Sequence, residues 1–224
     1  MRAIILVIIL FFSLQSISKP IKDFATEKDF LKTVVPEGAT NQRVDDTESD
    51  INDDNLRDIY GVVRYTYLSK DQNREFFKNR IFVLHKTVDG KYIANAVSKE
   101  FEYGGTNGRA YVEVVEPIGR NSFYIQLNER SVCGVYVYKF TFKLIKNEWR
   151  VVGLDHSDSV CNNDSEIGLT PSYEKSMNFL TGKFIVKTYK LGKLAGTKTL
   201  MKSFPVYLLE KFDPINTDYG KLHK

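Results

Sequence analysis

The stretch VYVYKFTFKL, residues 135–144, decides the fold. Its even-numbered positions are all large and apolar or aromatic, whereas lysine and threonine occupy positions 139, 141 and 143. Successive side chains of a strand point to opposite faces, so this alternation is typical of an antiparallel strand with one buried face and one face in water. The polar residues 146–148 then turn the chain into the apolar stretch 149–152, which predicts the second strand of a hairpin.

Segments rich in β-branched and aromatic residues recur on both sides of this hairpin. They predict strands over residues 59–68, 80–86, 111–115, 122–128, 135–145, 149–154, 183–189 and 203–209. No helical pattern of about 10 to 15 residues separates them, so a parallel βαβ arrangement is disfavoured. We therefore predict a mainly β protein, built as an antiparallel sheet or sandwich that is propeller-like at most in part, with one short N-terminal helix.

That helix is predicted after Thr26, which is placed to cap it, and it ends before Pro36. The rest of the chain divides around it into four parts. They are a signal peptide at residues 1–18, an N-terminal arm with the helix and an acidic loop at 19–58, an antiparallel β domain at 59–209 and a C-terminal tail at 210–224.

The beginning of the chain has the pattern of an export signal. Arg2 precedes the apolar residues 3–14, and Ser16 and Ser18 stand at positions −3 and −1 of a cleavage site before Lys19. The apolar run is shorter than the roughly 20 residues of a spanning helix, and no later segment approaches that length. We therefore expect no transmembrane segment after cleavage, and a periplasmic or extracellular location.

Charge is unevenly distributed along the expected mature chain. Without Arg2 it has 31 basic and 28 acidic residues, and this net charge of +3 is too small to indicate a nucleic-acid partner. Residues 37–58 carry a net charge of −6, whereas residues 174–224 have ten lysines against four acids. The two ends could lie together, the basic end could face an anionic partner, or its lysines could form an ordinary solvated surface.

Cys133 and Cys161 are the only two cysteines of the chain. In an exported protein an even number of cysteines predicts a disulfide bond, because the compartment is oxidising. This bridge would close a loop of about 29 residues and stabilise the fold by roughly 3 to 4 kcal/mol. The alternative is a thiol nucleophile, but neither cysteine stands in a recognisable catalytic setting.

The segment DINDDNLRD, residues 50–58, has the pattern of a loop for a hard cation. Its positions 1, 3, 5 and 9 carry oxygen side chains, and position 7 offers a backbone carbonyl; these are Asp50, Asn52, Asp54, Asp58 and Leu56. Position 6 requires a turn with positive φ, which Asn55 tolerates. We predict that the five residues bind Ca²⁺. A solvated acidic loop is the alternative, because position 12 is Gly61 where an EF-hand has glutamate.

The loop resembles the D-x-[DN]-x-D-G-x-x-D calcium loop of FG-GAP and VCBS-type repeats, with Asn55 in place of the glycine. Over about residues 32–190 the chain also resembles a group of exported bacterial proteins of uncharacterised function. The matching motifs are VPEG at 35–38, DGKY at 89–92, the hairpin at 138–153 and SMNFLTGK at 176–183. The resemblance implies a fold and an exported location, and it names no reaction. The loop occurs once, so a complete propeller is not predicted.

No complete catalytic motif is present, and no catalytic or cofactor-binding residue is predicted apart from the Ca²⁺ ligands. The segment LDHSD at 154–158 brings a base, carboxylates and a hydroxyl together in sequence. Neighbouring side chains of a strand point apart, so these groups are not expected to form a triad. The segment is expected at the polar exit of the strand that begins at Trp149. Trp149 itself is expected in the core rather than as a platform for a sugar.

Two main classes of function remain open. The first is an exported, non-enzymatic binding module of the cell envelope, for example an inhibitor or an immunity protein that binds an envelope or extracellular protein. The second is a hydrolase acting on cell-wall or glycan material, with Asp155, His156 or a carboxylate of the acidic loop in its chemistry. Convergence of these groups in a pocket would favour the hydrolase, and a broad exposed surface would favour the binding module. A purely structural envelope component is a third option.

Overall fold

The computed structural model describes residues 23–69, 74–104, 110–161 and 169–214. These residues form two antiparallel sheets, one α-helix and one 3-10 turn, so the predicted mainly β fold with a short helix is confirmed. The predicted signal peptide and most of the predicted C-terminal tail lie outside the described residues.

The N-terminal strands form one sheet, which we call sheet A. Its spatial order is β1, β5, β4, β3, β2, and β6 also pairs with β4. The strands are β1 (Asp23–Phe24), β2 (Thr40–Ser49), β3 (Asp58–Ser69), β4 (Arg74–Lys86), β5 (Tyr92–Val97) and β6 (Phe101–Glu102). The long β3–β4 hairpin pairs without a register shift and lies at the centre of this sheet.

The remaining strands form sheet B, in which each strand pairs with the next one along the chain. They are β7 (Ala110–Pro117), β8 (Ser122–Ser131), β9 (Gly134–Ile145), β10 (Glu148–Cys161), β11 (Leu169–Asn178), β12 (Lys183–Lys190) and β13 (Lys193–Met201). The β9–β10 hairpin contains the stretch that decides the fold. It aligns Phe142 with Val151 and Phe140 with Leu154 on the buried face.

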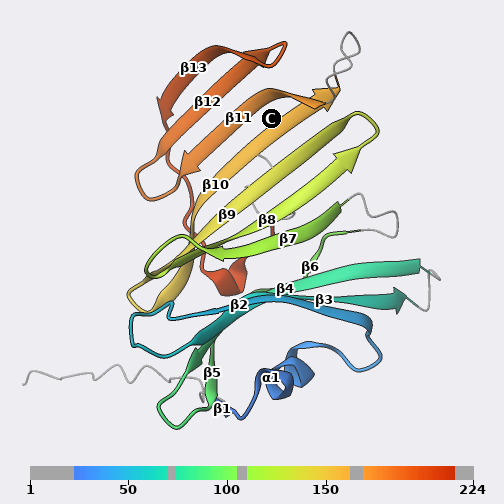
Figure 1. Cartoon of the computed structure of the whole chain (residues 1–224), viewed down its shortest axis with the longest axis vertical. Coiled ribbons are helices and arrows are strands. Elements are labelled where there is room, and N and C mark those ends of the chain that lie inside the picture. Colours follow the sequence, from blue (N-terminus) through green and yellow to red (C-terminus); the bar gives the residue numbers. More distant parts are fainter. Residues whose placement is uncertain (1–22, 70–73, 105–109, 162–168, 215–224) are drawn as a thin grey trace, which may run out of the picture.

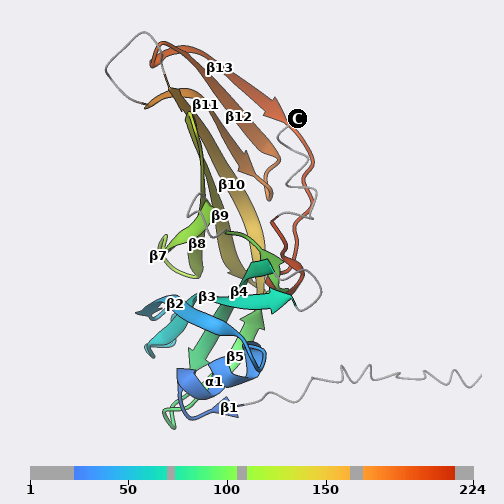
Figure 2. The same ribbon diagram turned by 90° about the vertical axis from the view of Figure 1, so that its right-hand side faces the viewer.

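Sheet A lies across one end of sheet B, and helix α1 (Glu27–Val34) covers the other face of sheet A (Figures 1 and 2). At this end of the molecule the layers are therefore helix, sheet A and sheet B. Strands β11 to β13 lie at the other end of sheet B, away from sheet A (Figure 1). The free end of sheet B is consequently more exposed than the part that contacts sheet A.

One continuous core fills the space between the two sheets. Phe123 on β8 and Tyr60 on β3 have ring centroids 5.1 Å apart, so this contact joins sheet B to sheet A. Phe123 also stacks on Phe142 at 5.0 Å and contacts Trp149 at 5.2 Å. All four side chains are fully buried, which places Trp149 in the core as predicted.

Helix α1 begins where the sequence predicts. Thr26 is the N-cap, and its hydroxyl oxygen accepts a hydrogen bond from the backbone N–H of Asp29 at 3.2 Å. Phe30 and Leu31 are buried against sheet A, where the ring of Phe30 lies 5.3 Å from that of Phe82. Among the described residues no helix is long and apolar enough to cross a membrane.

Strand β2 lies inside the predicted N-terminal arm. It pairs with β3 at the edge of sheet A although it is polar and acidic. An edge strand needs a partner on one side only and can keep its charged side chains in water. The pairing requires Gly61, because a Cβ atom there would lie 2.5 Å from the carbonyl oxygen of Asp45. A glutamate at position 61, as in an EF-hand, would therefore clash with β2.

The prediction of a strand at residues 203–209 is wrong. After β13 the chain leaves the sheet, makes one isolated bridge to β10 and enters the 3-10 turn η1 (Leu209–Lys211). Pro205 has no N–H to donate to a strand partner. Phe204, Leu209 and Phe212 are buried in the core, although Phe212 belongs to the predicted tail. The apolar pattern of this segment thus reflects burial rather than strand pairing.

Candidate metal centre

The acidic loop connects β2 to β3, and Asp58 is the first residue of β3. Asp53 and Asn55 have φ angles of 69° and 66°, in the left-handed region that short polar side chains tolerate. The turn predicted at Asn55 is therefore present. These two residues fold the loop back on itself within a few positions.

The carboxylate of Asp50 organises this loop. Its Oδ1 accepts hydrogen bonds from the backbone N–H groups of Asp53 at 2.8 Å and Asp54 at 3.1 Å, and its Oδ2 accepts one from Asn55 at 2.9 Å. Asp54 in turn accepts the N–H of Leu56 at 2.8 Å. The loop is thus curled around one carboxylate, and a second carboxylate is held beside the first.

Asp58 is the buried member of the group. Its carboxylate accepts backbone N–H bonds from Lys86 at 2.9 Å and from Ile51 at 3.3 Å. Burial nevertheless raises the pKa of Asp58 to about 6, and the charges of Asp54 and Asp50 add to this increase. A cation at this place would oppose these effects, because it favours the ionised form of each carboxylate.

Asp50, Asp54 and Asp58 each offer a carboxylate oxygen, and these oxygens lie within 4.8 Å of one another. The first two residues are exposed and the third is buried, so the group is open to solvent on one side. Such a group could hold a metal ion between the loop and the start of β3. The structure therefore brings together three of the five predicted ligands.

The other two predicted ligands take part in the loop through hydrogen bonds. The amide nitrogen of Asn52 donates to Asp54 Oδ2 at 2.8 Å, and its amide oxygen accepts the N–H of Asp54 at 3.2 Å. Leu56 contacts Asp54 through its own backbone N–H. Coordination by the Asn52 side chain and the Leu56 carbonyl stays a prediction.

Asp53 is the carboxylate of the loop that lies outside this group. It pairs with Arg120, which follows β7 in sheet B, at 3.0 Å. Both side chains are largely exposed, so the pair contributes at most about 1 kcal/mol to stability. This ion pair nevertheless places the acidic loop in contact with sheet B.

The two cysteines occupy the open end of the β9–β10 hairpin. Gly134 of β9 pairs with Val160 of β10; Cys133 is the residue before Gly134, in the β8–β9 turn, and Cys161 is the residue after Val160, at the end of β10. Cys133 is disulfide-bonded, and no described cysteine is free. The side chain of Cys161 lies outside the described ones, so the Cys133–Cys161 pairing stays a prediction.

Thiol titration of the unfolded, non-reduced protein is therefore expected to find no free thiol. Reduction should lower the free energy of unfolding by roughly 3 to 4 kcal/mol, because the unreduced unfolded chain is restricted by a loop of about 29 residues. Urea denaturation with and without reductant measures this difference. Two titratable thiols before reduction would exclude the bridge.

Asp155, His156 and Ser157 all border one pocket of about 410 Å³ on sheet B, but their side chains do not converge in it. They are consecutive in β10, so the side chains of Asp155 and Ser157 are on one face of sheet B and that of His156 is on the other. His156 is buried and stacks on Tyr138 with a centroid distance of 4.4 Å. The segment lies inside β10 rather than at the predicted strand exit, because β10 continues to Cys161.

Sequence reasoning missed a second cluster of polar side chains, formed by Tyr65, Lys78, Glu100 and Glu102 on sheet A. The residues come from three separate segments, and no local motif links them. The only local signal was the polar run at residues 78–80 inside the otherwise apolar and aromatic stretch 76–84 of β4. Comparison with known proteins adds no relative: no family model, curated protein or solved structure matches the chain.

Proposed function

We propose that the protein is an exported, non-enzymatic binding module of the cell envelope, stabilised by Ca²⁺, that binds an acidic protein partner as an inhibitor or immunity protein does. The observation that carries the proposal is the lysine-rich β12–β13 hairpin at the free end of sheet B (Figure 1). The catalytic candidates of β10 lie on opposite faces of their strand, which supports a binding role over hydrolysis.

The β12–β13 hairpin and the residue after it carry only positive charge. The charged residues between positions 183 and 202 are Lys183, Lys187, Lys190, Lys193, Lys198 and Lys202. Five of these six are exposed, and within the described chain only Lys187 forms an ion pair, at 3.0 Å from Glu174. A local excess of this size attracts an acidic surface and speeds its association.

The edge of the same hairpin favours a protein over a simple anionic polymer. β13 is the last strand of sheet B, so its outer backbone groups have no strand partner among the described residues. Leu194 and Met201 on this strand are 57% and 73% exposed. An acidic extended segment could add to the edge through backbone hydrogen bonds, with the lysines and apolar side chains providing selectivity.

Calcium is the cation that best suits the acidic loop. All the candidate ligands are oxygens, which hard cations prefer, and Ca²⁺ accepts them in flexible arrangements. Mg²⁺ demands a tighter octahedral shell and gives up its water reluctantly. The ion would join the exposed Asp50 and Asp54 to the buried Asp58 and so fasten the loop to β3. Its role in this proposal is structural.

Neutralising three lysines of the hairpin region, in the variant K193Q/K198Q/K202Q, is expected to weaken partner binding at least about tenfold. The immobilised mature protein would capture partners from the envelope fraction of its own cells. Binding of the purified partner would then be measured by biolayer interferometry at several salt concentrations. Wild-type binding should weaken as salt rises, since the contact is electrostatic.

The matched control is K28Q/K99Q/K143Q, which removes the same charge from exposed lysines outside the hairpin. It should bind like the wild type. Equal loss in the two variants would show that only net charge matters and would contradict a specific surface. Capture that survives protease treatment of the envelope fraction would identify a polymer instead of the proposed protein.

A further inference from the structure

Sheet A carries a pocket of about 460 Å³ on the same face as α1, beyond the end of that helix. This volume lies within the range of about 300 to 1,000 Å³ that small-molecule sites occupy. The pocket is lined by Pro36, Tyr65, Tyr67, Phe76, Lys78, Glu100 and Glu102. It lies on the other sheet from the lysine-rich hairpin, and none of its residues belongs to the acidic loop.

One wall of the pocket is aromatic. In the β3–β4 hairpin Tyr67 is directly opposite Phe76, and Tyr65 is opposite Lys78 two residues away, so all four side chains are on one face. Helix α1 ends at Val34 and leaves this part of the hairpin uncovered. Tyr67 is consequently 45% exposed although it lies on the same face as a buried core.

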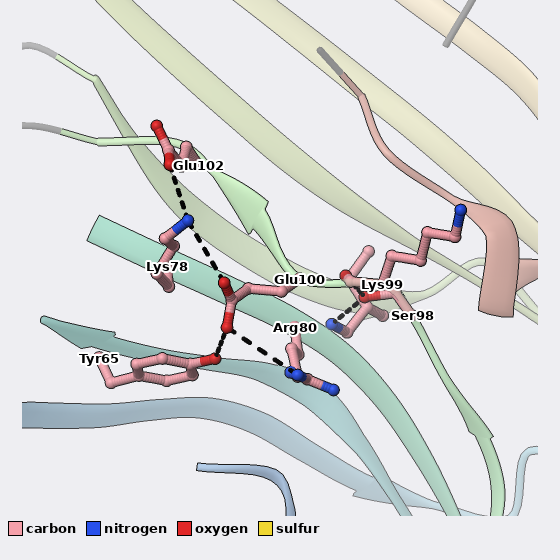
Figure 3. A network of polar contacts seen from close by, with 8 residues as sticks. Tyr65, Lys78, Arg80, Ser98, Lys99, Glu100 and Glu102 are labelled. Carbon is pink, nitrogen blue, oxygen red and sulfur yellow. Dashed lines mark hydrogen bonds and ion pairs between the residues drawn. The ribbon is translucent and has the colours of Figure 1, made fainter. Parts of the chain in front are cut away.

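The other wall is a connected polar network (Figure 3). Glu100 accepts a hydrogen bond from the hydroxyl of Tyr65. Its carboxylate also lies 3.3 Å from Lys78 Nζ and 3.9 Å from Arg80. Lys78 also donates to Glu102 at 2.7 Å. Burial and Glu100 raise the pKa of Tyr65 to about 12, so its hydroxyl stays protonated and keeps donating. These groups are therefore held in place before any ligand arrives.

The charges of this network balance. Lys78 and Arg80 oppose Glu100 and Glu102, although Arg80 is not one of the residues that line the pocket. Each carboxylate is already paired with a basic group, so the pocket offers little unpaired charge to a cation or an anion. A wholly apolar ligand would displace water from the charged groups and would not replace the hydrogen bonds that this water makes, so its binding would cost free energy. The ligand that fits is uncharged, has one apolar face for the ring of Tyr67 or Phe76, and carries several hydroxyls for Glu102 and Lys78.

We propose that this pocket binds a neutral saccharide. A sugar ring combines a face of C–H groups, which packs on an aromatic side chain, with hydroxyls that both donate and accept hydrogen bonds. Tyr67 is the stacking residue. Glu102 is the main hydrogen-bond acceptor, because its side chain is 55% exposed, whereas that of Glu100 is 30% exposed and is contacted by Tyr65 as well as two basic side chains. The site is independent of the lysine-rich hairpin, so either proposal can fail while the other stands.

Isothermal titration of the mature protein tests the proposal with three neutral probes, namely cellotetraose, maltotetraose and chitotetraose. At least one is expected to bind with a dissociation constant below about 1 mM. Tyr67→Ala and Glu102→Gln should each weaken that binding about tenfold, through loss of stacking and of a charge-assisted hydrogen bond respectively. Tyr67 and Glu102 are exposed, so both variants should keep the wild-type melting temperature.

The chain offers a matched control pair on sheet B, where the hydroxyl of Tyr124 donates to the exposed Glu116 at 2.6 Å. Tyr124→Ala and Glu116→Gln remove the same chemical groups and should leave saccharide binding unchanged. Absence of binding by all three probes would overturn the proposal. So would binding that Tyr67→Ala leaves intact, or tighter binding of choline than of any saccharide, which would indicate a cation site.

Discussion

Replacing Phe123 with alanine is expected to lower the free energy of unfolding by about 3 to 5 kcal/mol. Phe123 is fully buried and contacts Tyr60 of sheet A as well as Phe142 and Trp149 of sheet B. Its removal leaves a cavity where the two sheets meet, and close-packed neighbours on both sides can refill it only in part. A loss of this size is a large share of the typical 5 to 15 kcal/mol of a folded domain.

Urea denaturation followed by circular dichroism and by the fluorescence of Trp149, the only tryptophan, measures this loss. The two signals should change together, because one core joins the sheets and neither should unfold alone. Phe123→Leu keeps most of the volume and should cost less than about 1.5 kcal/mol. Val88→Ala, at a site that is 96% exposed, should change stability by less than about 0.5 kcal/mol. Separate transitions for the two signals would contradict a shared core.

Saturating Ca²⁺ is expected to stabilise the protein by about 2.7 kcal/mol at a free concentration one hundred times its dissociation constant. The physical reason is that the three carboxylates converge only in the folded loop, so the ion binds the folded chain and not the unfolded one. Thermal denaturation with Ca²⁺, with Mg²⁺ and with chelator measures the effect. Mg²⁺ should raise the melting temperature less than Ca²⁺ does.

Two neighbouring substitutions separate metal binding from general charge effects. Asp54→Asn removes a carboxylate of the converging group and should abolish the Ca²⁺-dependent rise in melting temperature. Asp53→Asn removes the same charge one residue away, at a carboxylate that pairs with Arg120, and should keep that rise. Asparagine also tolerates the positive φ of residue 53. If neither Ca²⁺ nor these substitutions changes the melting temperature, the loop is a solvated acidic connection.

Much of the fold can be predicted from local sequence because its signals are local. The alternation in residues 135–144 depends only on which side chains face the core, and the structure places Phe140 and Phe142 there. Thr26 caps α1 through a contact within three residues. The acidic loop likewise contains its own turn residues and ligands, so its spacing alone predicted that Asp50, Asp54 and Asp58 would meet.

Other strands carry no such local signal. β11 contains a proline and two charged residues, and β13 contains glycine and threonine with two lysines. Pro171 is tolerated where β11 has a register shift against β10, and β13 is tolerated as an edge. Both segments become strands because β10 and β12 offer them backbone partners, and a backbone partner is not visible in the segment itself.

The sequence by itself therefore determined the class of the fold, the cap of α1 and the carboxylate loop, since each rests on residues within a few positions of one another. Only the tertiary structure decided that the acidic β2 pairs beside Gly61 and that residues 203–209 fill the core instead of extending a sheet. The pocket around Tyr65 and Glu100 also belongs to the tertiary structure, because its residues come from distant segments. In each of these cases the deciding contact joins parts of the chain that only long-range packing brings together.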